Sequence, residues 1–143
     1  MRHALTVSAL LILTAPALAQ TPSESDAIFK AAGFKDVGGK YVRCEEDTTS
    51  SYVPGSIEMQ DINGDGVPEA WVHESSQVCF GDTSVAFVLM GKDKAGNWTR
   101  LLAAAGVPEV QASKTKDWPD ILVGGPGVGP MPPFKWTGVK YER

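Results

Sequence analysis

The sequence predicts a mostly β, α+β fold, with one short N-terminal helix and a small antiparallel sheet. Apolar residues follow helical spacing only near the start of the chain, before the pair Gly38 and Gly39. After that pair the chain breaks into short runs rich in β-branched and aromatic residues. Fifteen glycines and ten prolines are available for the turns between them. These observations favour strands joined by tight connections.

Residues 1–19 have the features of a secretory signal peptide. Arg2 precedes an apolar run over Ala4–Leu13, and Ala17 and Ala19 provide the small residues that a signal peptidase requires before its cleavage site. The run is too short to be a good membrane span, and no later segment approaches its length. We therefore expect an exported protein, periplasmic or secreted, with no membrane span in the mature chain.

The mature chain, residues 20–143, has the length of a single β-rich domain with its own core. The full sequence has 13 basic and 17 acidic residues, and removal of Arg2 with the signal leaves 12 bases against the same 17 acids. Because phosphate binding requires a basic surface, this balance argues against nucleic acid as a partner.

The predicted helix covers residues 24–32. Ser23 to Asp26 resembles an N-terminal capping box, and the next residues, Ala27–Ala32, have apolar side chains at helical spacing. Gly33 supplies a C-terminal stop. We expect this helix to cover one side of the sheet.

Eight short strands are expected after the helix. Val85–Met90 is apolar throughout, which predicts a central strand covered on both faces. Lys92–Asn97 predicts a hairpin loop, and Thr137 with Gly138 could form a second, two-residue hairpin. The expected strands are Lys40–Glu45, Ser56–Gln60, Ala70–Ser75, Ser84–Gly91, Trp98–Leu102, Ile121–Val123, Phe134–Trp136 and Val139–Glu142.

The stretch DINGDGVPE, Asp61–Glu69, lies between two of these strands and has the composition of a calcium loop. Calcium takes six to eight oxygen ligands, and a short loop supplies them if alternate side chains point inward around a sharp turn at Gly66. An EF-hand would need a glutamate at the twelfth position, where this chain has Val72. The predicted calcium ligands are Asp61, Asn63, Asp65, the Val67 carbonyl and Glu69.

A metal-free turn remains the alternative, because Asn and Asp side chains also bond to nearby backbone amides without any ion. The surrounding segment, Cys44–Gly91, contains nine acidic residues and no lysine or arginine. Such a segment is either a solvated acidic face or one whose charge is balanced by a bound cation.

DINGDGVPE resembles the D-x-N-x-D-G-x-x-[DE] loops of the integrin-type FG-GAP and related secreted β repeats, which hold calcium between strands. In those families the ninth position is usually Asp, where this chain has Glu69. The stretches GGKYVRC, DINGDGVPEAWV, WPDILVGGPG and FKWTGVKY are also similar to small exported bacterial proteins of unknown function. That second resemblance implies one exported domain and no particular activity.

Cys44 and Cys79 are expected to form a disulfide, since a cysteine pair in an exported protein is more often bridged than free. His73 stands beside Glu74, but neighbours on a strand point to opposite faces, so they are not expected to cooperate as acid and base. We therefore predict no catalytic residue.

Aromatic residues and prolines gather near the C-terminus, at Trp118, Phe134 and Trp136. They either cap the end of the core or form a rigid recognition surface. The favoured function is a non-catalytic, calcium-binding, disulfide-stabilised module that binds a protein or a glycan of the cell envelope. The alternatives are an inhibitor of a hydrolase such as lysozyme and a small metal-assisted hydrolase.

Overall fold

The structure of the protein is a computed structural model that describes residues 22–143. The predicted signal peptide, residues 1–19, lies outside the described residues. The elements in order are α1 (Pro22–Ala32), β1 (Lys35–Val37), β2 (Lys40–Val42), β3 (Val53–Gln60), β4 (Glu69–Ser75), α2 (Gln77–Phe80), a 3-10 turn η1 (Gly81–Thr83), β5 (Val85–Lys92), β6 (Trp98–Ala105), β7 (Val107–Thr115), β8 (Trp118–Gly124), β9 (Lys135–Trp136) and β10 (Tyr141–Glu142).

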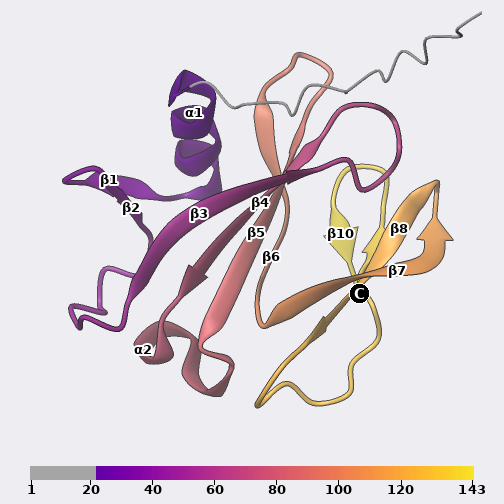
Figure 1. Cartoon of the computed structure of the whole chain (residues 1–143). Helices are drawn as coiled ribbons and strands as arrows, with labels where there is room; N and C mark the ends of the chain where they lie inside the picture. Colours follow the sequence, from indigo (N-terminus) through magenta and orange to yellow (C-terminus); the bar gives the residue numbers. More distant parts are fainter. Residues whose placement is uncertain (1–21) are drawn as a thin grey trace, which may run out of the picture.

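The centre of the fold is an antiparallel sheet of four strands in the order β3-β4-β5-β6. Three further pairs, β1-β2, β7-β8 and β9-β10, are antiparallel hairpins. Figure 1 shows α1 and the β1-β2 hairpin on one side of the sheet and the later hairpins on the other. The predicted α+β class, with an antiparallel sheet and an N-terminal helix, is confirmed.

Alternate residues of the sheet enter two different apolar clusters. Val72 on β4 and Val88 on β5 pack with Ile28 and Phe29 of α1. The next residue along β5, Leu89, packs on the other face with side chains from the later strands. The members of that second cluster are Trp71, Phe87, Leu89, Leu101, Leu102, Ile121, Val123, Trp136 and Tyr141.

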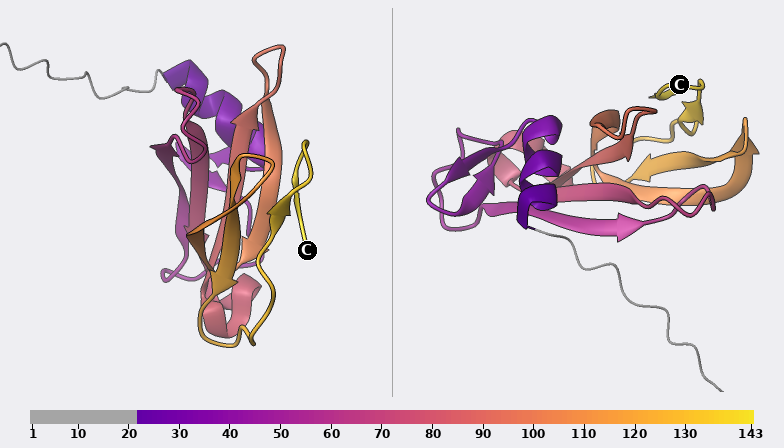
Figure 2. Two further views of the ribbon diagram at one scale, coloured as in Figure 1. Left: turned by 90° about the vertical axis from the view of Figure 1, so that its right-hand side faces the viewer. Right: turned by 90° about the horizontal axis from the view of Figure 1, so that it is seen from above.

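Strand β5 is therefore covered on both faces, as its apolar sequence predicts. Phe87, Val88, Leu89 and Met90 are all fully buried. A strand with period-two alternation would have shown one apolar face, whereas burial of both faces requires an unbroken apolar run. The two turned views in Figure 2 show α1 and the orange β7-β8 hairpin on different sides of the molecule.

Helix α1 begins at Pro22 and ends at Ala32, close to the predicted range of 24–32. Gly33 follows with a positive φ of 91°, and its amide donates to the Lys30 carbonyl at 3.1 Å. The glycine conformation thus ends the helix as expected. The chain turns here toward Phe34, whose ring packs edge-on against Phe29.

Several elements differ from the sequence prediction. Strands β1 and β7 and the short helix α2 were not predicted, and β6 continues to Ala105. The C-terminal hairpin pairs Trp136 with Tyr141, so its loop has the four residues 137–140 instead of two. Thr137 closes that loop because its amide donates to the Lys140 carbonyl at 2.9 Å. A side-chain bond from the Thr137 hydroxyl to the same carbonyl supports the longer loop.

Candidate functional site

The DINGDGVPE stretch forms the connection between β3 and β4, with Glu69 as the first residue of β4. In Figure 1 the magenta loop after β3 projects on the same side of the molecule as the later hairpins. Gly64 and Gly66 have φ values of 78° and 87°, a region that side chains other than glycine rarely adopt. These two glycines allow the chain to coil around the Asp61 side chain.

Asp61 is the centre of this coil. Its Oδ1 accepts from the Gly64 amide at 2.8 Å and from the Asp65 amide at 3.2 Å, and its Oδ2 accepts from the Gly66 amide at 2.9 Å. These bonds fix the backbone, and Oδ2, which accepts from one amide, has a further lone pair available. The geometry therefore suits a bare polar turn and also leaves acceptor capacity for a cation.

Asn63 and Asp65 are coupled to each other and to the backbone. Asn63 Oδ1 accepts from the Asp65 amide at 2.9 Å, while Asn63 Nδ2 donates to Asp65 Oδ2 at 3.1 Å. Asp65 Oδ1 accepts from the Val67 amide at 2.7 Å. Three of the predicted ligands thus lie on one continuous network of hydrogen bonds, together with the backbone of Val67.

Glu69 differs from the other acids because it is buried, with 3% of its surface exposed. Its Oε2 accepts one backbone bond, from the Ile62 amide at 3.0 Å. Burial raises the pKa of Glu69 to about 7, and the negative charges of Asp65 and Asp61 act in the same direction. Among the salt bridges of residues 22–143, none involves Glu69. The loop therefore holds a buried carboxyl near two other acids without a neutralising side chain.

The carboxylate oxygens of Asp61, Asp65 and Glu69 do not lie as close together as the ligands of one ion do. Oxygens on opposite sides of a calcium ion lie about 4.8 Å apart. Within residues 22–143, the group of acids and cysteines with ligand atoms this close consists of Cys44, Glu46 and Cys79. Because those sulfurs are joined in a disulfide, they are not thiolate ligands. A cation in the loop would need the carboxylates of Asp61, Asp65 and Glu69 to move closer together.

The predicted disulfide between Cys44 and Cys79 is present in the structure, with the two Cα atoms 6.2 Å apart. It ties the segment after β2 to α2. Beside it, Ser76 caps α2 by accepting from the Cys79 amide at 3.0 Å, and the Ser76 hydroxyl donates to Asp47 Oδ2 at 2.8 Å. Asp47 and Ser76 are both buried, so the bridge lies over a small polar core.

The sequence did not indicate the ion pair between the buried Glu74 and the partly buried Arg43. Arg43 Nε donates to Glu74 Oε1 at 2.5 Å, and the Tyr52 hydroxyl donates to Oε2 at 3.1 Å. Both oxygens of Glu74 are thus occupied by structural partners. His73, which precedes Glu74 on β4, lies on the opposite face of the sheet beside Trp71. Burial lowers the pKa of His73. His73 and Glu74 therefore do not form an acid–base pair.

The aromatic residues divide into core and surface. The Trp118 and Trp136 rings stack with centroids 4.3 Å apart, and the Tyr141 ring lies 5.3 Å from Trp136. Trp136 is buried, whereas Trp118 is partly exposed. Both indoles line an open cleft of about 420 Å³ between the β5-β6 turn and the C-terminal hairpin. Phe134 does not line it, and its ring is instead covered by the Arg143 guanidinium, 4.0 Å from the ring centroid.

Comparison with known proteins found no family model, no curated protein and no solved structure that matches this chain. No helix within residues 22–143 is long and apolar enough to cross a membrane.

Proposed function

We propose that the protein is an exported, non-catalytic module that binds calcium through the Asp61–Glu69 loop and recognises a protein or glycan of the cell envelope. The observation that carries the calcium part is the environment of Glu69. Its carboxyl is buried, lies near Asp61 and Asp65, and has no cationic side chain as a partner within residues 22–143. A bound divalent ion would relieve this repulsion.

Calcium fits the donor set better than the other common cations. The candidate ligands are carboxylates, a carboxamide and a backbone carbonyl, which are the hard oxygen donors that calcium prefers. Zinc sites usually include nitrogen or sulfur ligands, and magnesium demands a tighter octahedron and retains its waters. The resemblance to FG-GAP loops supports the same choice, because those loops hold calcium between strands.

The test is thermal unfolding of the mature chain in millimolar calcium and in chelator. An ion that binds only the folded chain stabilises it by about 2.7 kcal/mol at a hundredfold excess over Kd. Asp65→Ala is expected to abolish this rise, and magnesium to reproduce little of it. A wild-type Tm that is the same in calcium and in chelator would overturn the calcium proposal.

Asp36→Ala is a matched control for the Asp65 variant. Asp36 also accepts a backbone bond in a turn, from the Gly39 amide at 2.8 Å, but it belongs to the β1-β2 hairpin. Its loss is expected to change the basal Tm without changing the response to calcium. The comparison separates loss of a turn bond from loss of a metal ligand.

Two observations support the binding part of the proposal. Trp118 and Trp136 line an open cleft, and rigid aromatic walls allow binding at a small cost in conformational entropy. The Cys44–Cys79 disulfide fits a protein that works in an oxidising compartment such as the periplasm or the outside of the cell. Cosedimentation of the mature chain with isolated cell envelopes tests this part directly. The control is a protein of similar charge that does not bind cell envelopes.

A further inference from the structure

The connection between β3 and β4 contains two chemically unstable pairs of residues, Asn63 followed by Gly64 and Asp65 followed by Gly66. An asparagine or aspartate before glycine closes readily to a succinimide, because glycine has no side chain to hinder attack by its own amide nitrogen. Each kind of pair occurs once in the sequence, and the two are adjacent. This loop is therefore the part of the chain that is most susceptible to the reaction.

The reaction needs only the chain and water. At Asn63, the Gly64 amide nitrogen loses its proton and bonds to the side-chain Cγ, the bond from Cγ to Nδ2 breaks, and the leaving group takes up protons and departs as ammonia. At Asp65, the Gly66 nitrogen attacks the protonated carboxyl group in the same way, and water leaves. Water then opens either ring at one of its two carbonyls, which gives aspartate or isoaspartate. Isoaspartate routes the main chain through Cβ and lengthens it by a methylene group.

In the folded loop, one carboxylate holds both attacking nitrogens. Asp61 Oδ1 accepts from the Gly64 amide at 2.8 Å, and Asp61 Oδ2 accepts from the Gly66 amide at 2.9 Å. Each nitrogen must lose the proton that it donates to Asp61 before it can attack. The negative charge of the carboxylate also disfavours the amide anion, because like charges repel. Reaction at either pair therefore requires that a charge-assisted hydrogen bond be broken first.

The two side chains that would be attacked are held in place as well. Asn63 Oδ1 accepts from the Asp65 amide at 2.9 Å, and Asn63 Nδ2 donates to Asp65 Oδ2 at 3.1 Å. Asp65 Oδ1 in turn accepts from the Val67 amide at 2.7 Å. Each side chain is thus bonded to the residue two positions ahead. Ring closure would require rotation of the side chain and loss of these bonds.

We propose that Asn63 and Asp65 are sites of spontaneous isoaspartate formation, and that the folded loop suppresses the reaction through Asp61. The inference is independent of calcium and of envelope binding, since every contact on which it rests lies within the loop. When the loop opens, the two nitrogens are released and the reaction proceeds as in an unstructured chain. The added methylene group then prevents the loop from closing around Asp61, so that unfolding leaves a permanent chemical mark.

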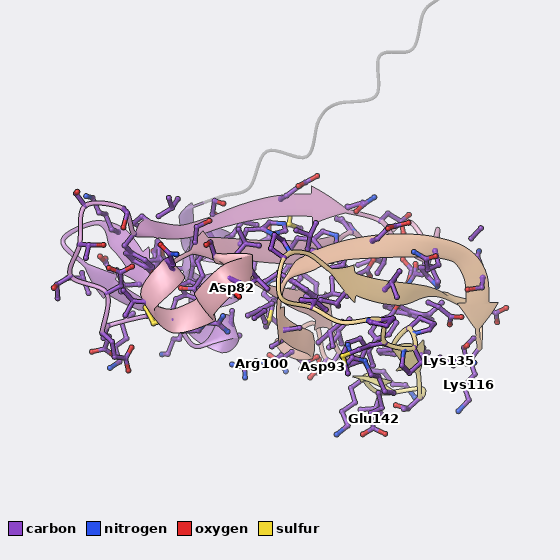
Figure 3. All side chains as sticks on the ribbon, turned by 90° about the horizontal axis from the view of Figure 1, so that it is seen from below. Asp82, Asp93, Arg100, Lys116, Lys135 and Glu142 are labelled. Carbon is purple, nitrogen blue, oxygen red and sulfur yellow. A yellow bond between two sulfur atoms is a disulfide. The ribbon has the colours of Figure 1, made fainter. Side chains whose placement is uncertain are left out.

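The second asparagine of the sequence, Asn97, provides an internal control. It is followed by Trp98, whose side chain hinders attack and whose backbone pairs with Lys92 in the β5-β6 ladder. Figure 3 labels Asp93, whose Oδ1 accepts from the Asn97 amide at 2.9 Å in the turn before Trp98. Asn97 is therefore expected to remain unmodified over a period in which Asn63 reacts in the unfolded chain.

The test is peptide mapping by mass spectrometry after incubation of the mature chain at neutral pH in chelator, both folded and in guanidinium chloride. The readouts are conversion of Asn63 to aspartate and isoaspartate and of Asp65 to isoaspartate, which chromatography separates from its isomer of equal mass. We expect the folded chain to react about tenfold to a hundredfold more slowly, since release of a hydrogen bond to a charged group raises the barrier by roughly that factor. Equal rates in the folded and unfolded chains would overturn the proposal.

Asp61→Ala isolates the contribution of the carboxylate. In this variant, folded and in chelator, modification of Asn63 and Asp65 is expected to accelerate by about tenfold or more. Asp61→Asn should give an intermediate rate, because its carboxamide is uncharged and accepts through a single oxygen. Asp36→Ala, which removes a backbone acceptor from the β1-β2 turn, should leave the slow rate unchanged. The Tm of each variant shows that it is folded during the incubation.

A folded Asp61→Ala chain that reacts as slowly as the wild type would show that Asp61 does not suppress the reaction, and would overturn the proposal. Amide hydrogen exchange in the wild type tests the same two bonds without any substitution. The Gly64 and Gly66 amides are expected to exchange more slowly than those of an unstructured chain. Exchange of both amides at the unstructured rate would also contradict the proposal, even if the Asp61→Ala chain does not fold.

Discussion

Two buried carboxyls, Glu69 and Asp120, show how strongly local partners determine the state of a single residue. Glu69 receives one backbone bond and lies near two other acids, so burial raises its pKa to about 7. Asp120 is equally buried but accepts from the Thr115 hydroxyl at 2.7 Å and the Ser113 hydroxyl at 2.8 Å. These bonds hold the pKa of Asp120 below its ordinary value. One buried acid is therefore stabilised as an anion and the other is not.

The raised pKa of Glu69 predicts that the calcium-free protein becomes more stable as pH falls. The folded chain binds a proton at Glu69 below about pH 7, whereas the unfolded chain does so only near 4.5. The cost of the buried charge, about 3 kcal/mol at most, is thus complete above pH 7 and disappears toward pH 4.5. Urea unfolding in chelator at pH 8 and at pH 5 measures the net change, to which His73 contributes with the opposite sign because burial lowers its pKa.

Glu69→Gln isolates this contribution from other titrating groups. In chelator at pH 8 the variant is expected to be more stable than the wild type, and the difference should fall to below about 1 kcal/mol at pH 5. In calcium the order should reverse, because the variant lacks a charged ligand. A variant that is less stable than the wild type in chelator at pH 8 contradicts the environment described for Glu69.

Asp120→Ala is expected to lower the free energy of unfolding by about 2 to 3 kcal/mol at neutral pH, because it removes two hydrogen bonds to a buried charge. The contribution of Asp120 is full above the ordinary Asp pKa and is lost as pH falls through the lower pKa of the folded state. Glu109→Ala, at an exposed acid of the same hairpin, should change stability by less than about 0.5 kcal/mol. Equal losses in the two variants, measured by urea unfolding, would contradict this account.

At the scale of elements, β7 shows why a strand can escape sequence prediction. Its burial does not alternate, and its pairing with β8 shifts register between Val110 and Lys114. A bulge of this kind interrupts the period-two pattern by which a strand is recognised. Short β1 has three exposed residues and no apolar pattern at all. Both strands form because a partner strand lies beside them.

The disulfide connects α2 with the segment after β2. Cys44 and Cys79 are 35 residues apart, and closure of a loop of this length stabilises the fold by about 4 kcal/mol in the chain-entropy model. We expect reduction to lower the urea midpoint accordingly, or by less if the unfolded chain is already compact. The double variant Cys44→Ala and Cys79→Ala should be insensitive to reductant, which checks that the bridge is the cause.

At the scale of the whole molecule, the packing of α1 on the sheet depends on a glycine in β3. A Cβ atom at Gly55 would lie 2.7 Å from the Phe34 ring and 2.8 Å from the Phe29 ring, closer than such contacts occur. Gly55→Ala is therefore expected to cost about 1 to 3 kcal/mol, through displacement of these rings. The measurement is chemical unfolding of the purified variant.

Gly124→Ala provides the matched comparison, since a Cβ atom at that position in β8 would meet nothing within 4 Å. This second variant is expected to be neutral or more stable by up to about 1 kcal/mol, because alanine restricts the unfolded chain. If both variants lose the same stability, close packing between β3 and α1 is not the reason for the glycine.

The amino-acid sequence by itself determined the features that rest on local pattern. Gly33 predicted the end of α1, although the helix begins at Pro22, ahead of the predicted capping residues. The unbroken apolar run over Val85–Met90 predicted a strand buried on both faces, and an isolated cysteine pair predicted the disulfide. The Asp61–Glu69 loop was also singled out by its residue spacing, and calcium binding by this loop remains a prediction. Such features depend on residues that are close together in the chain, and the sequence gives their identity and spacing directly.

Only the tertiary structure decided which distant residues meet. It buried Glu69 beside the loop acids, paired Glu74 with Arg43, and stacked Trp118 on Trp136. The sequence could not predict these contacts, because each contact joins side chains from distant segments. The relative positions of these segments follow from the packing of two apolar clusters on opposite faces of one sheet. Periodicity predicts that a residue is covered, but the identity of the residue that covers it depends on the path of the whole chain.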